Sequence, residues 1–222
     1  PFAKRVIERT LFRSYSPLLD RVNWDARLHS TISAHFGSGV ELESREELYR
    51  YVNTRLNSGQ QAIDYFEFGV YEGNSLRLWC SLNSNSNSRF FGFDSFEGLP
   101  QDWRRGKLKG AFSTNGRQPS VTDQRVQFIV GWFQKSLPAF LNSYNRKNQL
   151  VINMDCDLYA STLYCLTSLN HLVSSGTIII FDEFYDSLHE YRALTDWSSA
   201  YMRNYQLMAW SNGITQAAII VI

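Results

Sequence analysis

Short apolar runs alternate with helical patterns over most of the chain. Apolar runs of strand length cover residues 63–68, 90–93, 126–130, 150–154 and 177–181. Helical patterns lie before, between and after them, at 44–57, 76–82, 136–144, 161–169 and 187–204. The run TIIIF is almost continuously apolar, as is typical of a strand covered on both faces in a parallel sheet. This alternation predicts an α/β domain built around a mostly parallel sheet.

The last two strand patterns of the chain lie close together. Residues 205–210 and 214–222 read as strands, and only Ser211, Asn212 and Gly213 separate them. An Asn-Gly pair in so short a connection is a strong signal for a β-hairpin. We therefore expect the parallel part of the sheet to be followed by an antiparallel hairpin.

The first 43 residues lack this order. Their apolar spacing is irregular, and Ser30 to Gly39 has the composition of a loop. One or two short helices, or an arm packed outside the sheet, are expected here. Such an arm would cover a binding site or a partner subunit of a homo-oligomer. Because Ser44 and Glu47 form a capping box at the start of the next helix, the chain divides into an N-terminal helical arm or cap (1–43) and a main domain (44–222).

The stretch 62–98 combines a strand, a glycine turn, a helix and a second strand that ends on a carboxylate. Gly69 and Gly73 allow the backbone of the turn to approach a ligand. Ser75 is expected to cap the helix, whose amino end favours a polar or anionic group. Asp94 follows Gly73 by 21 residues, close to the offset at which a carboxylate binds a nucleoside ribose in doubly wound folds. The stretch predicts a nucleoside site, although glycine turns also occur in α/β domains without one.

Two nucleoside cofactors compete for this turn. A dinucleotide site would carry three glycines as G-x-G-x-x-G, whereas this turn has two and follows Glu67. A carboxylate repels a pyrophosphate and attracts the cationic amino-acid end of S-adenosylmethionine, so the sequence favours S-adenosylmethionine over NAD. The cofactor-binding residues expected from this stretch are Glu67, Gly69, Val70, Tyr71, Gly73, Asn74, Ser75, Asp94, Ser95 and Phe96.

Two further segments bear on the site. Trp132 and Phe133 follow the strand at 126–130, where an adenine could stack against them or they could pack in the core. Residues 99–124 form a long connection, rich in Gly, Arg, Lys and Ser, after the carboxyl end of a strand. Loops this long are usually functional or disordered, so a mobile substrate loop and plain disorder both stay open.

Composition excludes several classes of partner. The chain has 222 residues, 44% of them hydrophobic, and a net charge of +1, so one sizeable domain without broad nucleic-acid binding is expected. No apolar run reaches the length of a membrane span. Three cysteines without metal-ligand spacing suit a reduced, cytoplasmic protein. The chain begins on Pro1 rather than Met, which leaves open whether a segment precedes it.

Four phrases in order resemble the macrocin O-methyltransferase family: FEFGVYEGNSL, FGFDSFEGLP, INMDCDLYASTLYCL and GTIIIFDEF. The resemblance covers roughly residues 44–222, and the terminal hairpin is how a class I methyltransferase sheet ends. It implies a Rossmann-like class I methyltransferase fold with a seven-stranded, mostly parallel sheet. It also implies transfer of a methyl group from S-adenosylmethionine to a sugar hydroxyl of a glycosylated natural product.

The resemblance also implies a Mg²⁺ site. The family's metal ligands match Asp155, after the fourth strand, and the pair Asp182 and Glu183, after the fifth. The family more often has Asp-Asp for that pair. Because carboxyl ends of adjacent parallel strands lie about 4.8 Å apart, these side chains can converge on one ion, although each could also be a structural loop or capping carboxylate. Asp155 is additionally expected beside the cofactor.

Methyl transfer to a hydroxyl also requires a proton acceptor. His189, which follows the acidic pair closely, and Asp155 are the catalytic candidates. Two alternatives stay open: a metal-independent methyltransferase with a non-sugar acceptor, and a non-catalytic domain that binds the cofactor or serves assembly. Residues 1–43 and 102–123 match the family poorly, so the sequence leaves the small-molecule acceptor unnamed.

Overall fold

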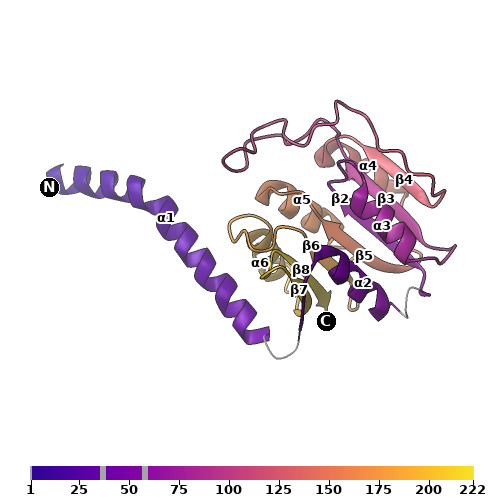
Figure 1. Cartoon of the computed structure of the whole chain (residues 1–222). Coiled ribbons are helices and arrows are strands. Elements are labelled where there is room, and N and C mark those ends of the chain that lie inside the picture. Colours follow the sequence, from indigo (N-terminus) through magenta and orange to yellow (C-terminus); the bar gives the residue numbers. More distant parts are fainter. Residues whose placement is uncertain (1, 36–38, 57–59) are drawn as a thin grey trace.

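The structure is a computed structural model that describes residues 2–35, 39–56 and 60–222. Its centre is an eight-stranded sheet in the order β1-β7-β8-β6-β5-β2-β3-β4 (Figure 1). All neighbouring strands are parallel except β8, which runs antiparallel to β6 and β7. The strands are β1 (Val40–Leu42), β2 (Ile63–Phe68), β3 (Arg89–Asp94), β4 (Val126–Val130), β5 (Gln149–Met154), β6 (Ile178–Phe181), β7 (Tyr205–Ser211) and β8 (Gln216–Val221).

Helices cover both faces of the sheet. On one face, α2 and α3 pack with Tyr65, Val151 and Ile180 of the central strands. On the other, α4, α5 and α6 pack with the alternate side chains of the same strands, including Phe66 and Ile152. The helices are α1 (Phe2–His35), α2 (Arg45–Arg55), α3 (Asn74–Leu82), α4 (Phe133–Ser143), α5 (Tyr159–Leu169) and α6 (Glu190–Ala200). The central strands are therefore buried on both faces, as their continuous apolar runs predict.

The predicted α/β fold with a terminal hairpin is confirmed, with one strand more than expected. Strand β1 adds to the edge of the sheet beside β7, where Val40 to Leu42 pair in parallel with Ala209 to Ser211. Three residues are too few to give a periodic pattern, so this strand has no sequence signal of its own. It lies inside the segment predicted as an arm, and the division at residue 43 stays a prediction.

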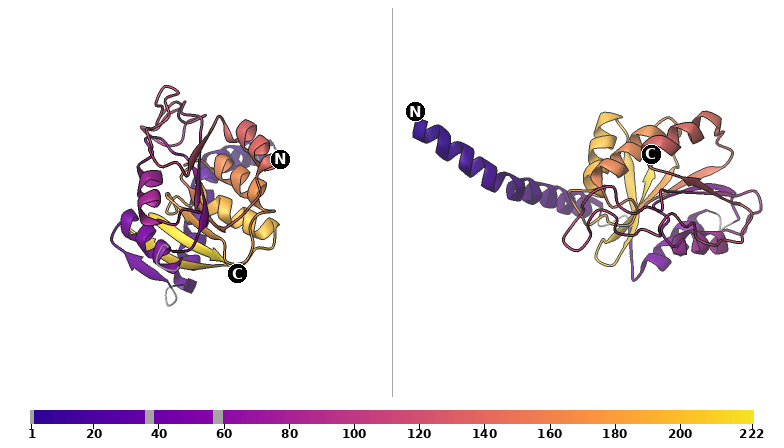
Figure 2. Two further views of the ribbon diagram at one scale, coloured as in Figure 1. Left: turned by 90° about the vertical axis from the view of Figure 1, so that its right-hand side faces the viewer. Right: turned by 90° about the horizontal axis from the view of Figure 1, so that it is seen from above.

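The N-terminal segment contains one helix of 34 residues rather than one or two short ones. The loop predicted from Ser30 to Gly39 is wrong for residues 30–35, which are helical, and residues 36–38 lie outside the described part. Trp24 and Leu28 join the core beside α6, and Trp24 meets Tyr191 edge-on at 6.3 Å. Away from this contact, the axis of α1 leads away from the sheet (Figure 2).

The connection order places a crevice at the centre of the sheet. From β2 the chain moves outward through β3 to β4, then returns to β5 on the other side of β2 and continues to β6. Ligands of open α/β sheets bind at such a reversal, beyond the carboxyl ends of the strands. Within the described residues, no helix is long and apolar enough to cross a membrane.

Candidate active site

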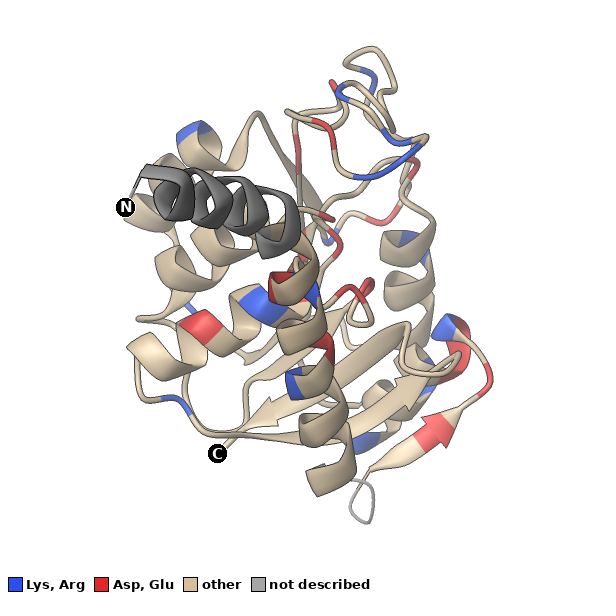
Figure 3. Cartoon of the chain, turned by 90° about the vertical axis from the view of Figure 1, so that its left-hand side faces the viewer, with Lys and Arg blue, Asp and Glu red and all other residues tan. Residues whose placement is uncertain are grey.

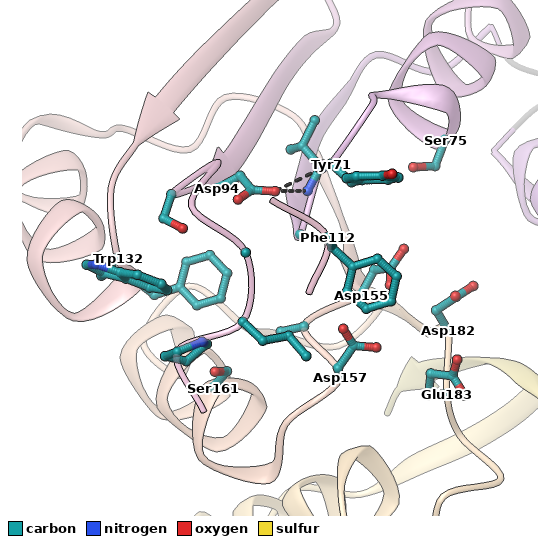
Figure 4. Close-up of a pocket in the computed structure, with 18 of the residues that line it drawn as sticks. Tyr71, Ser75, Asp94, Phe112, Trp132, Asp155, Asp157, Ser161, Asp182 and Glu183 are labelled. Carbon is teal, nitrogen blue, oxygen red and sulfur yellow. Dashed lines mark hydrogen bonds between the residues drawn. The ribbon is translucent and has the colours of Figure 1, made fainter. Parts of the chain in front are cut away.

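A cavity of about 370 Å³ lies at the carboxyl ends of β2, β3, β5 and β6 (Figure 4). Most of the predicted site residues line it: Gly69, Val70, Tyr71, Asn74, Ser75, Asp94, Ser95, Trp132, Phe133, Asp155, Asp182 and Glu183. Glu67, Gly73, Phe96 and His189 are not among the lining residues. The structure thus brings the predicted cofactor and acidic residues into one cavity and leaves four residues behind or beside it.

The glycine turn after β2 is fixed by close backbone contact. Gly69 has a φ of +93°, and a Cβ atom there would lie 1.8 Å from the carbonyl oxygen of Asp155. Gly73 has a φ of 75° and is the N-cap of α3. The predicted cap, Ser75, instead lies in the first turn of the helix, and its hydroxyl donates to Glu67 at 2.9 Å. The turn therefore requires glycine at both positions, for contact at one and for backbone conformation at both.

Asp94 holds this turn in place. One carboxylate oxygen accepts the backbone N–H groups of Val70 and Tyr71, each at 2.8 Å (Figure 4). The other accepts the N–H of Phe96 at 2.7 Å. Tyr71 and Phe96 both have left-handed backbone conformations, with φ of 50° and 59°. An ionised carboxylate has about four acceptor sites, so one site remains for a ligand hydroxyl.

Glu67 lies behind the turn. Its side chain is fully buried and accepts hydrogen bonds from the hydroxyl of Tyr65 at 2.6 Å and of Ser75 at 2.9 Å. Burial raises the pKa of Glu67 to about 7, although these two bonds and the charge of Arg45 oppose the rise. Glu67 can therefore act on a ligand through its charge and through Ser75, which does line the cavity.

The buried Glu67 makes stability dependent on pH. Because its pKa is raised from 4.5 to about 7 in the folded protein, folding favours the protonated form. The resulting stabilisation is complete below pH 4.5 and is lost as the pH rises through 7. Glu67→Gln keeps the shape without the titration. As the pH rises from 4.5 to 8, we expect the unfolding free energy of the variant to increase by about 3 kcal/mol relative to that of the wild type. Urea denaturation across this range measures the difference, and a pH-independent difference would contradict it.

Four carboxylates form an acidic edge along one side of the cavity (Figure 4). They are Asp155, Asp157, Asp182 and Glu183, from the ends of the neighbouring strands β5 and β6. Burial, then the charges of Asp182 and Asp157, raise the pKa of Asp155 well above its usual range. Burial, then the charge of Glu183, raise the pKa of Asp157 to about 7.

Arginines engage this acidic edge. Arg45 donates from Nη1 to both oxygens of Asp182, at 3.0 and 3.2 Å, and the same nitrogen lies 3.9 Å from Asp155 Oδ2. Arg104 lies 3.4 Å from Glu183 Oε1 and also contacts the hydroxyl of Tyr185. The electrostatic repulsion of the acidic edge is thus partly offset by the protein itself.

Two of the three predicted Mg²⁺ ligands are paired with arginines in this structure. Carboxylate oxygens are the donors that Mg²⁺ prefers, but Asp182 is engaged by Arg45 and Glu183 by Arg104. Over the described part of the chain, no group of three or more His, Cys, Asp or Glu side chains could hold a metal ion. The Mg²⁺ site at Asp155, Asp182 and Glu183 therefore stays a prediction.

His189 occupies a structural position. It is the N-cap of α6, its Nδ1 accepts the backbone N–H of Tyr159 at 3.2 Å, and its ring lies edge-on to Trp103 at 6.3 Å. Burial lowers the pKa of the imidazole. With Nδ1 engaged, the neutral ring carries its proton on Nε2. Its position favours support of the loops beside the cavity over proton acceptance from a bound ligand.

Sequence reasoning missed several residues of the site. Arg45 was predicted only as part of a helix, and no role in the site was predicted for Asp157 or Ser161, yet all three line the cavity. The sequence did contain one signal for Arg45. A cation in the first turn of a helix interacts unfavourably with the helix dipole, which indicates that Arg45 has a stabilising or binding partner elsewhere.

The long connection after β3 is held by specific hydrogen bonds. Leu99 and Ala111 are joined by a backbone bond of 2.9 Å, and Trp103 packs with Leu99 and Leu158. Leu99, Pro100 and Phe112 line the cavity. These contacts give the segment a defined path, unlike plain disorder. Figure 3 shows this segment at the top of the view, with its Lys and Arg residues in blue. Its role as a substrate loop stays a proposal.

The fold and the cavity define an α/β domain with a glycine turn and an acidic edge around one cavity at the carboxyl ends of its strands. The model of a family described as "Methyltransferase domain" matches residues 66–184, more than half of the chain. The protein therefore belongs to this methyltransferase family.

Two curated relatives are named as O-methyltransferases. The 8-demethyl-8-(2,3-dimethoxy-alpha-L-rhamnosyl)-tetracenomycin-C 4'-O-methyltransferase of Streptomyces olivaceus is 28% identical over 69% of this chain and 66% of its own length. The demethyldecarbamoylnovobiocin O-methyltransferase of Streptomyces niveus is 31% identical over 60% of this chain and 59% of its own length. The chain thus spans slightly less than two thirds of the first and about three fifths of the second.

Solved structures support the fold. The O-methyltransferase NovP is similar with a TM-score of 0.62 and 23% identity, over 79% of this chain and 78% of its own. A calicheamicin methyltransferase is similar with a TM-score of 0.56 and 19% identity, over 99% and 85%. At these identities the likeness extends to the fold alone.

Proposed function

We propose that the protein transfers the methyl group of S-adenosylmethionine to a hydroxyl of a small molecule, a sugar carried by a natural product. The observation that carries this proposal is the shared cavity. The glycine turn fixed by Asp94 forms one side of it, and the acidic edge forms another. The named relatives support the choice of acceptor, because the first acts on a rhamnosyl tetracenomycin.

The lining of the cavity favours one orientation of the cofactor, with its adenine toward β4 and its amino-acid end toward α3. The remaining acceptor site of Asp94 suits a ribose hydroxyl, as ribose-binding carboxylates do in this class of fold. Trp132 and Phe133 line the cavity on the side of β4, where an adenine would meet their rings. The amino-acid end then lies toward Ser75, with the buried Glu67 behind it. This direction agrees with the cofactor-binding residues expected from the sequence.

The chain's own residues position the acceptor and take its proton. S-adenosylmethionine supplies an electrophilic methyl group, so the protein's tasks are alignment and deprotonation. Leu99, Pro100 and Phe112 provide an apolar part of the cavity wall. Asp155 faces the cavity from the end of β5, beside the turn that binds the cofactor. We assign it as the group that accepts the hydroxyl proton.

The proposal also includes the cellular setting, the domain division and the metal. Three free, buried cysteines support a reduced, cytoplasmic setting. We propose that the chain divides into a helical arm (1–43) and a methyltransferase domain (44–222). In a homo-oligomer, the arm would cover a partner subunit. Mg²⁺ assistance is the part of the prediction that the side-chain contacts support least, because Arg45 and Arg104 engage two of the three ligands.

Methyl transfer from labelled S-adenosylmethionine to a panel of glycosylated and unglycosylated acceptors tests the proposal. We expect label in a glycosylated product. Asp155→Asn should lower kcat by about 100-fold or more, in the usual range for loss of a general base, and turnover should persist in excess EDTA. Cofactor binding without turnover on any acceptor would favour the non-catalytic alternative. Loss of turnover in EDTA, with recovery in Mg²⁺, would restore the metal-dependent mechanism.

A further inference from the structure

We propose that Arg45 binds the carboxylate of the methionine end of S-adenosylmethionine. The inference rests on the proposed function and adds to it the residue that recognises the anionic part of the cofactor. The starting observation is the charge of the cavity. Among its described lining residues six are carboxylates, Glu72, Asp94, Asp155, Asp157, Asp182 and Glu183, and the one cation is Arg45.

This excess of negative charge favours binding of the ammonium group of the methionine end and disfavours binding of its carboxylate. The ammonium and sulfonium of S-adenosylmethionine are attracted by the carboxylates around them. Its own carboxylate is repelled by the same groups, and this repulsion is strong where water is scarce. The carboxylate therefore needs a cation inside the cavity, and Arg45 supplies one.

Arg45 has donors left for this task. Its bonds to Asp182 both come from Nη1, whereas a guanidinium has five N–H groups. Within the described residues, Nε and Nη2 donate to no protein acceptor. The side chain is 36% exposed, although Asp182 is only 11% exposed. A second carboxylate can thus approach the guanidinium from the open side while Asp182 keeps it oriented.

The location of Arg45 also fits. It is the first residue of α2, lines the cavity and lies beside Asp155 and Asp182 at the ends of β5 and β6. Its charge acts on the buried Glu67 as well as on Asp155 and Asp182. Arg45 therefore lies at the acidic edge, and its charge also reaches Glu67 behind the turn that would hold the amino-acid end. The placement also explains a cation in the first turn of a helix, where the helix dipole disfavours it.

Two ligands that differ only in this carboxylate test the inference: S-adenosylmethionine and decarboxylated S-adenosylmethionine, measured by calorimetry. We expect the wild type to prefer S-adenosylmethionine. Arg45→Met should weaken its binding roughly 10- to 100-fold, as for loss of a hydrogen-bonded charge, and should change decarboxylated binding less than about twofold. Arg45→Lys, which keeps the charge, should fall between. Arg104→Met is the matched control, since it removes another arginine of the acidic edge and should leave the preference intact.

The outcomes separate the possible roles of Arg45. Equal weakening of both ligands in Arg45→Met and Arg45→Lys would overturn the inference and make Arg45 a residue that only positions Asp182. Unchanged binding of S-adenosylmethionine in Arg45→Met would overturn it in favour of backbone N–H groups at the start of α3. Failure of the wild type to bind either ligand would contradict the proposed function itself.

Discussion

Asp94→Ala is expected to weaken S-adenosylmethionine binding by about 100-fold to 10,000-fold. The carboxylate accepts three backbone N–H groups, from Val70, Tyr71 and Phe96, and it is the proposed partner of the ribose. Bonds to a charged acceptor contribute about 1.5–3 kcal/mol each. Loss of the bond to the ribose, together with a cost of similar size for a turn no longer fixed before binding, gives the expected range. Calorimetric titration with S-adenosylmethionine measures it.

Two companion variants make the Asp94 result specific. Asp94→Asn keeps one carbonyl oxygen as an acceptor and should bind with intermediate affinity. Asp102→Ala removes a carboxylate that accepts a single backbone N–H, that of Lys109, and should bind nearly as the wild type does. Binding by Asp94→Ala within a few-fold of the wild type would mean that Asp94 neither fixes the turn nor meets the ribose.

Gly69→Ala is expected to destabilise the whole domain by about 4 kcal/mol or more, in the range of the most damaging substitutions. The added Cβ would lie 1.8 Å from the carbonyl oxygen and 2.8 Å from the carbonyl carbon of Asp155. Both are backbone atoms, so no side-chain rotation relieves the overlap. The Asp155 N–H also bonds the carbonyl of Phe68 at 2.9 Å, which ties this peptide to β2. Relief of the overlap must therefore separate the ends of β2 and β5.

Calorimetric unfolding measures this effect, with a fall in Tm of roughly 8–16 °C for a domain of this size. Gly106→Ala is the matched control, because Gly106 also has a positive φ, +80°, but nothing lies within 4 Å of its added Cβ. It should cost only about 1 kcal/mol, for the left-handed conformation. Equal Tm values for the two variants would show that backbone conformation, and not the contact with Asp155, accounts for the need for glycine.

The positions of most strands along the chain were predictable, because each of these strands carries its own sequence signal. Short apolar runs marked the central strands, and Asn212-Gly213 marked the hairpin. The extra strand β1 was not predictable, since three residues give no period and the strand forms by pairing with β7. The helix that continues through Ser30 was missed for a related reason. Its stability comes in part from Trp24 and Leu28, which pack in the core beside α6.

The sequence could predict which residues of the site lie near one another, but not which hydrogen bonds and ion pairs they form. Because carboxyl ends of parallel strands share one edge, the sequence could place Asp94, Asp155 and Asp182 near one another. It could not show that Asp94 is mostly used by backbone N–H groups, since that depends on the left-handed conformations of Tyr71 and Phe96. Nor could it show that Arg45 pairs with Asp182, 137 residues away.

The most direct test of the account is a crystal structure with S-adenosylhomocysteine, the product of methyl transfer. The account predicts the ligand in the cavity at the carboxyl ends of β2, β3, β5 and β6, with a ribose hydroxyl at Asp94 and the adenine beside Trp132 and Phe133. It further predicts the sulfur on the side of Asp155, and the ligand carboxylate against Arg45. A cavity that stays empty at saturating S-adenosylhomocysteine, or a ligand bound elsewhere on the protein, would contradict it.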